Sequence, residues 1–421
     1  MEIFGLKIKK KVKFPVLIRE NKPQKLAKIK DETVSPDILV IAPSFFPKSG
    51  EIEEYIYNRC LQDRERVIVL TASCVGDRVF DRIQKFAIYR WRIPKFGLTP
   101  FFNLLGSVLL AIKLYFRYRY RYIECSYGYN FVALLLLSYL LPVRFFVYVQ
   151  GNEILRALRN PWVRSLLSFT LKRATGIVCD SFFIRNFLTR YFQFQTPTHV
   201  IHPVLRKEKF DDIEDPNCIE NLRQKVRNSH NIPTSAVVIL SVGKLQKHQG
   251  FNLVIDNLPP LLTLGLDVHY IICGQGPFEE ELRSQVRYLR LEPRVHFCKA
   301  IPEKKLAGYY AACDIFAMLS FIDYKAASIE GFSVVYLEAS YFGKPIIASC
   351  LSGAVDAVRH EENGILVNPH SGSEMLTAFR RLCEDKGLRE KLGHRGKALA
   401  SSKSLHELLS LAESHYRCLL I

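Results

Sequence analysis

The stretch Ser328–Asp356, with the sequence SIEGFSVVYLEASYFGKPIIASCLSGAVD, contains the strongest fold signal in the chain. It predicts a helix that begins near Ser333, because a serine hydroxyl can accept a hydrogen bond from a first-turn N–H group. The helix should end at Gly343, since Pro345 lies just beyond and cannot continue it. Residues 345–349 are mostly apolar and predict a strand. The block therefore predicts a helix and a strand in direct succession.

Two acidic residues are placed around this predicted helix. Glu330 precedes it and Glu338 lies within it, with seven residues between them. The N–H groups at a helix start and the positive end of its dipole favour an anion. Glu338 lies a little over two turns further on, at about 80° around the helix axis. One acid can therefore face a reacting group while the other reaches a second part of the same ligand.

The composition bounds the class of protein. The chain has 421 residues, of which 48% are hydrophobic and 24% charged, as in a soluble globular protein with two full cores. Its eleven cysteines show no paired spacing, so they indicate neither a zinc site nor a disulfide framework and suit a reducing cytoplasm. The net charge of +18 indicates an anionic partner, such as nucleic acid, a nucleotide sugar or an acidic membrane.

The sequence shows neither a secretory signal nor a segment long enough to cross a membrane. The longest apolar run, Phe131–Leu141, ends at Pro142. A spanning helix needs about 20 apolar residues. The run therefore predicts a buried helix, followed by a buried strand at Phe145–Val149.

Strand and helix patterns alternate along the chain, which predicts an α/β fold with two doubly wound, Rossmann-like domains facing each other across a cleft. The expected organisation is a basic N-terminal arm (1–35), a first Rossmann-like domain (36–205), a charged and irregular hinge (206–235), a second Rossmann-like domain (236–400) and a C-terminal helix (401–421).

The first domain should open with the strand Asp37–Ala42, a loop containing Gly50 and a helix from about Glu51. A strand that leads through a glycine loop into a helix is the usual phosphate-facing start of a doubly wound sheet. An acid at position 51 would repel a phosphate, so the exact role of this loop stays open.

Two basic segments allow several interpretations. The arm 1–35 is rich in lysine and is either a solvated tail or attracted to anionic lipid. The segment Phe101–Tyr122 begins apolar and ends in arginines and tyrosines, so it predicts a helix with a basic end. That helix could be part of the core, could contact a membrane surface, or could stack on single-stranded RNA.

The Ser328–Asp356 block resembles the signature of the family 4 retaining glycosyltransferases, which have the two-domain GT-B fold. The matching residues are Glu330, Glu338, the turn Gly343-Lys344-Pro345 and the segment Asn363–Val367. The run Asp314–Met318, followed by residues 330–338, is most similar to phosphatidylinositol mannosyltransferases and related lipid or polysaccharide transferases.

The resemblance implies that the first domain (36–205) holds the acceptor, that the second domain (236–400) binds the nucleotide-sugar donor and that the C-terminal helix (401–421) crosses back to the first domain. It also implies roles for individual residues and a UDP- or GDP-linked sugar as donor. Glu330 and Lys244 would be catalytic, and Glu338 would hold the ribose hydroxyls. Other donor-binding residues would be Gly243, Lys247, Gln249, Lys299, Phe332, Ser333 and Val334. Acceptor or sugar contacts would come from Gly50, Gln150 and Asn152. The resemblance implies no metal and no further cofactor, since a lysine and the helix dipole would take the place of a cation.

Four positions depart from the family pattern. Glu51 stands where the family usually has a second glycine after Gly50. Gln150 stands where the family usually has a histidine, and an amide cannot act as a base near neutral pH. Lys244 stands where an arginine is typical and lacks its bidentate fork. Gln249 stands where a lysine helps to clamp the donor diphosphate, so that charge is lost.

The leading hypothesis is a retaining hexosyltransferase, peripheral on the cytoplasmic face of the plasma membrane, with a lipid, lipid-linked or polysaccharide acceptor. One alternative is the same fold with a soluble acceptor. Another is a catalytically silent protein that binds sugar nucleotides or serves as a scaffold. Nucleic-acid binding is favoured by the charge alone, and no recognition module supports it, so no nucleic-acid partner is expected. The sugar, the base, the acceptor and the linkage are not given by the sequence.

Overall fold

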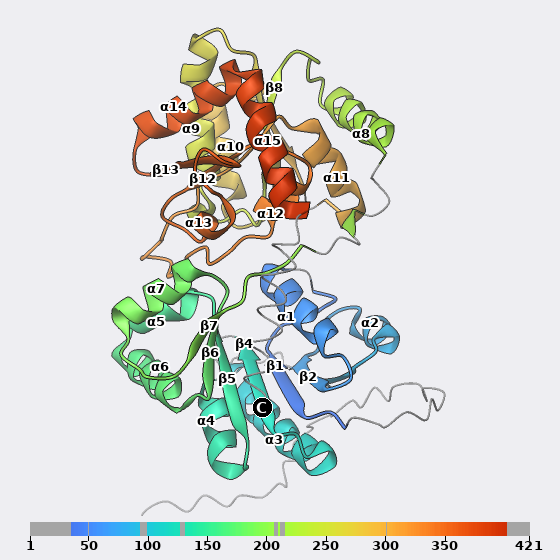
Figure 1. Ribbon diagram of the computed structural model, residues 1–421, viewed down its shortest axis with the longest axis vertical. Coiled ribbons are helices and arrows are strands. Elements are labelled where there is room, and N and C mark those ends of the chain that lie inside the picture. The colour runs from blue at the N-terminus through green and yellow to red at the C-terminus, as the bar shows by residue number, and fades with distance from the viewer. Residues whose placement is uncertain are drawn as a thin grey trace, which may run out of the picture. The chain divides into compact units, whose positions relative to one another are not determined.

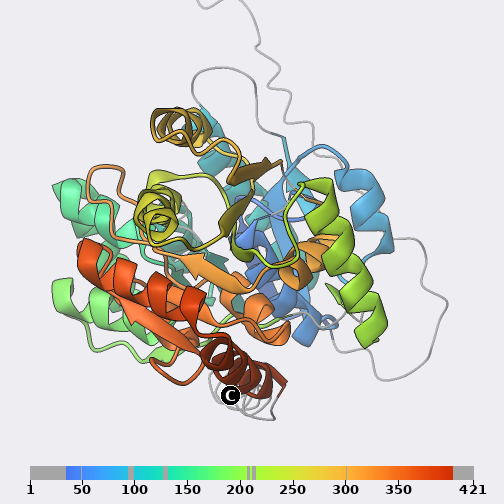
Figure 2. The ribbon, with the colours of Figure 1, turned by 90° about the horizontal axis from the view of Figure 1, so that it is seen from above.

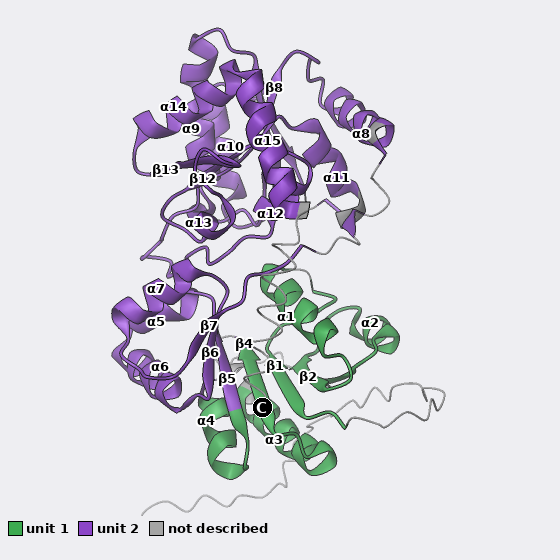
Figure 3. Ribbon diagram, viewed as in Figure 1, with its two compact units in different colours: residues 1–125, 132–144 green, residues 126–131, 145–421 purple. Residues whose placement is uncertain are grey.

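The computed structural model describes residues 35–48, 50–92, 99–126, 131–205, 209–210, 215–299 and 301–401. The predictions for the arm up to residue 34 and for the C-terminal helix beyond residue 401 lie outside the described residues. The chain divides into two compact units (Figure 3): residues 1–125 with 132–144, and residues 126–131 with 145–421. The predicted domain boundaries stay a prediction.

The first unit is built on four parallel strands in the order β3-β2-β1-β4. The strands are β1 (Ile38–Ala42), β2 (Val67–Ala72), β3 (Ala87–Trp91) and β4 (Tyr122–Ser126). The helices are α1 (Glu51–Gln62), α2 (Asp77–Ile83), α3 (Thr99–Tyr118) and α4 (Phe131–Leu140). The predicted first strand and the helix start at Glu51 are confirmed.

The basic segment Phe101–Tyr122 is only partly the helix that its sequence predicts. Helix α3 ends at Tyr118, and Arg119 has a φ of 54°, in the left-handed region that ends a helix. The aromatic residue Tyr122 already belongs to β4, where its side chain is buried. Pairing of β4 with β1 therefore outweighs the helical pattern over the last residues of the segment.

The second unit begins with three parallel strands, which are β5 (Arg144–Val149), β6 (Gly176–Cys179) and β7 (Thr198–Val200). The helices between them are α5 (Asn152–Arg159), α6 (Pro161–Arg173) and α7 (Phe182–Tyr191). The strand predicted at Phe145–Val149, directly after the helical run, is confirmed.

A six-stranded parallel sheet follows in the order β10-β9-β8-β11-β12-β13. Its strands are β8 (Val237–Val242), β9 (Val268–Cys273), β10 (Val295–Cys298), β11 (Ile315–Met318), β12 (Ile346–Ser349) and β13 (Gly364–Val367). Its helical elements are α8 (Pro216–Ser229), the 3₁₀ turn η4 (Lys247–Gln249), α9 (Phe251–Thr263), α10 (Glu279–Tyr288), α11 (Glu303–Ala312), α12 (Val335–Tyr341), α13 (Ala354–Ala357), α14 (Gly372–Glu384) and α15 (Lys386–Ser401).

Helices cover both faces of this sheet (Figures 1 and 2), with α9 and α14 on one face and α8 and α11 on the other. Alternate strand residues enter different cores, as the period of two requires. Ile239 packs with the α9 and α14 side, whereas Val238 and Leu240 pack with the α11 and α12 side. The predicted doubly wound α/β architecture is thus confirmed.

The prediction of an irregular stretch over residues 206–228 is wrong for its second half, which forms α8. Asp215 caps this helix by accepting a hydrogen bond from Asn217 N at 3.2 Å, and Pro216 occupies the first helical position. An acid followed by proline is a recognised helix start, which the high charge of the segment concealed.

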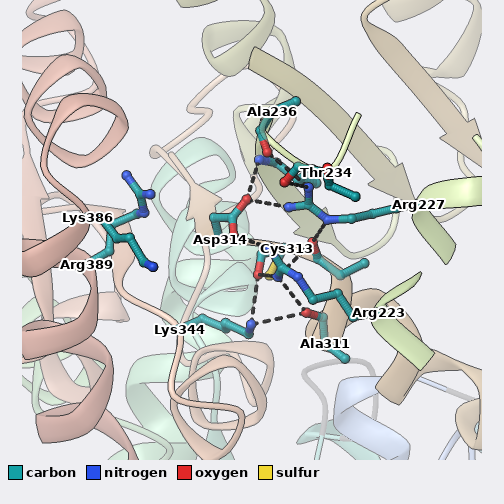
Figure 4. Close-up of polar contacts among 12 residues, drawn as sticks. Arg223, Arg227, Thr234, Ala236, Ala311, Cys313, Asp314, Lys344, Lys386 and Arg389 are labelled. Atoms are coloured by element: carbon teal, nitrogen blue, oxygen red, sulfur yellow. Dashed lines mark hydrogen bonds and ion pairs between the residues drawn. The ribbon is translucent and has the colours of Figure 1, made fainter. Parts of the chain in front are cut away.

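Helix α8 is fixed by a buried ion cluster at the end of α11 (Figure 4). Asp314 accepts hydrogen bonds from Arg223 at 2.8 Å and from Arg227 at 2.6 Å. Burial alone would raise the pKa of Asp314, but the two guanidinium groups outweigh it and lower that pKa. Lys344, from the Gly-Lys-Pro turn, donates to the carbonyl of Cys313 at 2.8 Å. The lysine of this motif therefore caps a helix C-terminus, where a cation is favoured.

We expect Asp314→Asn to lower the free energy of unfolding by about 3 kcal/mol, because it leaves Arg227 buried without its counter-charge. The stabilisation should be present above about pH 4, the unfolded-state pKa of aspartate, and should be lost as the pH falls through the lowered folded-state pKa. Urea unfolding at several pH values measures both effects.

Glu280→Gln is the matched control, since Glu280 also pairs with an arginine at 2.8 Å but is 74% exposed. The free energy of unfolding of this variant should differ from that of the wild type by less than about 0.5 kcal/mol. Equal losses for the two variants would contradict the role assigned to the buried cluster.

Candidate active site

The predicted helix of the Ser328–Asp356 block is α12, and it begins later than expected. Its N-cap is Val334, and no side chain caps it, so the predicted cap by Ser333 is wrong. Its end is as predicted: Gly343 has a φ of 65°, and Lys344 N donates to the carbonyl of Ala339 at 2.9 Å. The helix is short because Ser333 and the residues before it belong to the loop that leaves β11.

This loop and the helix start are deeply buried. Ser333 is completely covered, and Glu330 is 4% exposed. The side chains of Phe332 and Val334 belong to the hydrophobic core on the α11 and α12 side of the sheet. Of the predicted donor contacts, these two can therefore offer a ligand only their backbone.

Gly331 is the point at which three backbone segments meet. A Cβ atom at this position would lie 2.5 Å from Asp180 Oδ2 and 2.7 Å from the carbonyl oxygen of Gln150. A Cβ at Gly353 would lie 1.5 Å from the carbonyl oxygen of Gly331. Gly353 N also donates to the carbonyl of Glu330 at 3.0 Å. The ends of β5, β6 and β12 thus hold the Glu330 loop from several sides.

The residues after β5 lie against the same loop. Asn152 Oδ1 accepts a hydrogen bond from Ile329 N at 3.0 Å, and Gln150 N donates to Glu153 Oε1 at 2.5 Å. Gly151, at φ 110°, leaves no room for a side chain beside Ile329. Asn152 therefore positions the segment before Glu330, and the sugar contacts expected of Gln150 and Asn152 stay predictions.

Two buried acids near the loop have raised pKa values. Burial raises the pKa of Asp180 well above its usual value, and the nearby Glu153 raises it further. Burial also raises the pKa of Glu153, against the hydrogen bond that it accepts from Gln150 N. The sequence marks Asp180 only as a polar residue at a strand end, so its contact with the Glu330 loop was not predicted.

His202 and Asp356 form a second contact that the sequence does not reveal. His202 Nε2 lies 2.9 Å from Asp356 Oδ2, which also accepts a hydrogen bond from Phe182 N at 2.5 Å. The imidazole lies near the rings of Phe182 and Phe332, at centroid distances of 5.5 and 5.3 Å. These contacts connect the segment after β7 to the Glu330 loop.

Glu338, the second predicted acid, is buried with two partners. Tyr310 OH donates to its Oε2 at 2.7 Å, and Lys209 Nζ donates to its Oε1 at 3.0 Å. Both partners are distant in sequence and were not predicted. Burial, together with the charge of Glu338, raises the pKa of the Tyr310 hydroxyl well above its usual value.

Glu330 and Gln249, both predicted from the sequence, are in direct contact. Gln249 Nε2 donates to Glu330 Oε2 at 2.5 Å, although 81 positions separate them in the chain. Gln249 ends η4, directly after β8, and Glu330 follows β11, the neighbouring strand. Carboxyl ends of adjacent parallel strands meet at one edge of a sheet, which is where open α/β sheets bind ligands.

The other predicted donor residues lie at the same edge. Gly243 follows β8, and its carbonyl oxygen would lie 1.9 Å from a Cβ at Gly274, so the ends of β8 and β9 approach closely. Lys244, Lys247 and Lys299 are exposed. Gly50 belongs to the other unit, where it precedes α1, and its predicted ligand contact stays a prediction.

Within the described residues, no cluster of three or more His, Cys, Asp or Glu side chains is arranged to hold a metal ion. None of the described helices combines the length and the apolar character needed to cross a membrane.

Comparisons with known proteins found a family model that matches the part of the chain containing this sheet. Residues 223–399 match the model of the family "Glycosyl transferases group 1". A GDP-mannose-dependent alpha-(1-6)-phosphatidylinositol monomannoside mannosyltransferase of Mycolicibacterium smegmatis is 29% identical over 42% of this chain and 46% of its own length. A D-inositol 3-phosphate glycosyltransferase of Corynebacterium glutamicum is 31% identical over 40% of each chain. The match thus spans less than half the length of these curated relatives.

Solved structures match over most of the chain. A sucrose-phosphate synthase from Thermosynechococcus elongatus has a TM-score of 0.75 at 19% identity and covers 91% of this chain and 99% of its own. Anabaena HepE, solved with UDP and glucose, has a TM-score of 0.72 at 21% identity and covers 90% of this chain and 99% of its own. At these identities the likeness shows the fold. Residues 223–399 thus match the glycosyl transferases group 1 family model, and the chain has the α/β fold, with two Rossmann-like domains, of the GT-B glycosyltransferases.

Proposed function

We propose that this protein is a retaining hexosyltransferase that takes a hexose from a UDP- or GDP-linked donor. The observation that carries the proposal is the contact between Glu330 and Gln249 at the ligand-binding edge of the six-stranded sheet, beside the start of α12. The matched family and the names of the relatives support a nucleotide-sugar donor. The relatives include one that acts on a phosphatidylinositol monomannoside, which favours a lipid acceptor.

The leaving nucleotide diphosphate would be stabilised without a metal. Lys244 would supply the main positive charge, from the loop after β8. The backbone N–H groups of Ser333 and Val334 lie where α12 begins, at the positive end of the helix dipole. Such fixed donors act strongly on developing charge because they need no reorganisation during the reaction.

Glu330 would face the sugar. The transition state of glycosyl transfer resembles an oxocarbenium ion, which a carboxylate nearby stabilises. Glu338 would accept from the ribose hydroxyls, since a carboxylate has about four lone-pair sites and Tyr310 and Lys209 use two of them. The two acids thus serve different parts of one donor.

We expect Glu330→Gln to slow turnover about 100-fold or more while donor affinity changes little, because the amide keeps the shape but loses the charge that matters in the transition state. Glu338→Gln should mainly weaken donor binding. Slow hydrolysis of UDP-glucose or GDP-mannose without acceptor measures turnover, and calorimetry measures affinity. Wild-type hydrolysis in the Glu330 variant would remove that residue from the mechanism.

A second candidate is a protein that binds sugar nucleotides without transferring the sugar. It is favoured by the neutral Gln249 at a position where the family has a cation, and by Gln150 in place of a histidine. Calorimetric binding of a nucleotide sugar with no hydrolysis and no transfer to any lipid or glycan would support this candidate over the enzyme.

We also propose that the acceptor is met at an anionic membrane surface, through α3. Leu105, Leu109 and Phe116 are exposed on this helix, Phe116 by 64%. At helical spacing these three residues fall within about 40° of arc, with Lys113 and Arg117 about 40° and 80° beyond them. An apolar stripe flanked by cations is the pattern of a helix that lies in a membrane interface.

The variant Phe116→Ser should reduce binding to vesicles that contain anionic phospholipid by about tenfold or more, because burial of a phenylalanine contributes roughly 2 kcal/mol. Sedimentation with vesicles at low and high salt measures the binding, which salt should weaken. Val79→Ser is the control, since Val79 is 72% exposed on α2 of the same unit. Equal losses for both variants, or binding that salt leaves unchanged, would contradict the role of α3.

A further inference from the structure

Gln249 differs from the other predicted donor residues because it is buried and only one of its two polar side-chain atoms, Nε2, has a hydrogen-bond partner. Its side chain is 7% exposed, and its Oε1 atom has no hydrogen-bond partner among the described residues. Its Nε2 atom donates to Glu330 Oε2 at 2.5 Å and lies 3.4 Å from His248 Nε2. A buried polar atom without a partner costs about 1–3 kcal/mol, so such an atom at a ligand-binding edge calls for a ligand.

The orientation of this amide is fixed by its neighbours. Burial lowers the pKa of His248 to about 4, so its ring is neutral at pH 7 and its Nε2 can accept a hydrogen bond. The Glu330 carboxylate also accepts. Both contacts therefore require the NH₂ group of Gln249 on their side, and this turns Oε1 to the side where no described residue donates a hydrogen bond to it.

A second buried polar group without a hydrogen-bond partner lies in the loop that follows β11. Ser320 is completely buried, and its hydroxyl also has no partner among the described residues. Its loop lies against η4, because Phe321 N donates to the carbonyl of His248 at 2.8 Å and a Cβ at Gly250 would lie 2.2 Å from the carbonyl oxygen of Leu319. The loop after β11 thus adds a second buried neutral group, a hydroxyl, close to η4.

We propose that Gln249 is a positioning residue for Glu330 and that its Oε1 accepts a hydrogen bond from a hydroxyl of the donor hexose. The inference rests on the proposed function and names which part of the donor this position reads. A lysine here would attract the diphosphate by charge, whereas an amide is neutral and matches a hydroxyl. Gln249 therefore acts on the sugar, and the diphosphate is left to the exposed lysines.

The test compares Gln249→Met with the same change at Gln246, which lies three positions earlier and is half-buried. Methionine has nearly the same length as glutamine but neither donates nor accepts strongly. We expect Q249M to lower the turnover of donor hydrolysis about tenfold or more, since the amide is lost from Glu330. We also expect it to weaken binding of UDP-glucose or GDP-mannose about tenfold, the value of one hydrogen bond of about 1.4 kcal/mol.

Binding of UDP and GDP without a sugar should stay within about twofold of wild type, because the lost contact belongs to the hexose. Q246M should behave as wild type in every assay. A third variant, Q249K, should bind UDP and GDP more tightly without recovering turnover. Thermal unfolding of each variant checks that the fold is kept, and calorimetry with the four ligands separates the sugar from the diphosphate.

Several results would overturn the inference. If Q249M weakens UDP or GDP binding as much as nucleotide-sugar binding, Gln249 reads the diphosphate and the inference is wrong. Wild-type turnover in Q249M removes its role toward Glu330. The proposed function fails in a different way: if the wild-type protein itself binds none of the four ligands, both proposals fall together.

Discussion

The close backbone approach at Gly331 is the constraint on which the candidate site depends. A side chain at this position would collide with Asp180 and with the carbonyl of Gln150, and one at Gly353 would collide with Gly331. Interiors are packed without voids, so a contact of this kind admits one backbone arrangement. Glu330 is the residue before Gly331, and its position follows from this packing. Strand ends far apart in the sequence thus place one carboxylate.

Electrostatics at the site follow from the same burial. Glu153 and Asp180 are acids near the Glu330 loop, and burial raises the pKa of each. A raised pKa favours the protonated form of an acid, which carries no negative charge. Burial acts on His248 in the same way, because it disfavours the charged, protonated imidazole and so lowers its pKa to about 4. The exposed lysines Lys244, Lys247 and Lys299 supply positive charge near the sheet edge, which suits an anionic donor.

The sequence predicts most of the local elements and few of the long-range contacts. The strands β1, β5 and β12 and the end of α12 follow from apolar runs and from glycine and proline, which act within a few residues. The hydrogen bond between Gln249 and Glu330, the partners of Glu338 and the role of Lys344 could not be predicted, since each joins residues that only the folded sheet brings together. Helix α8 was missed because its charge suggested a hinge, although Asp215 and Pro216 mark its start.

Two departures from the family pattern, Gln249 and Lys244, can be explained together from the structure. A lysine at position 249 would be buried against Glu330, and a buried ion pair gains little when its desolvation is counted. A glutamine at this position keeps a hydrogen bond to Glu330 without a second buried charge. Lys244, Lys247 and Lys299 remain at the surface of the same edge, where their desolvation costs little until a ligand arrives. Under the proposed function, the chain would separate two tasks that one lysine would combine: exposed lysines would supply charge for the phosphates, and the neutral, buried Gln249 would fix the geometry of Glu330.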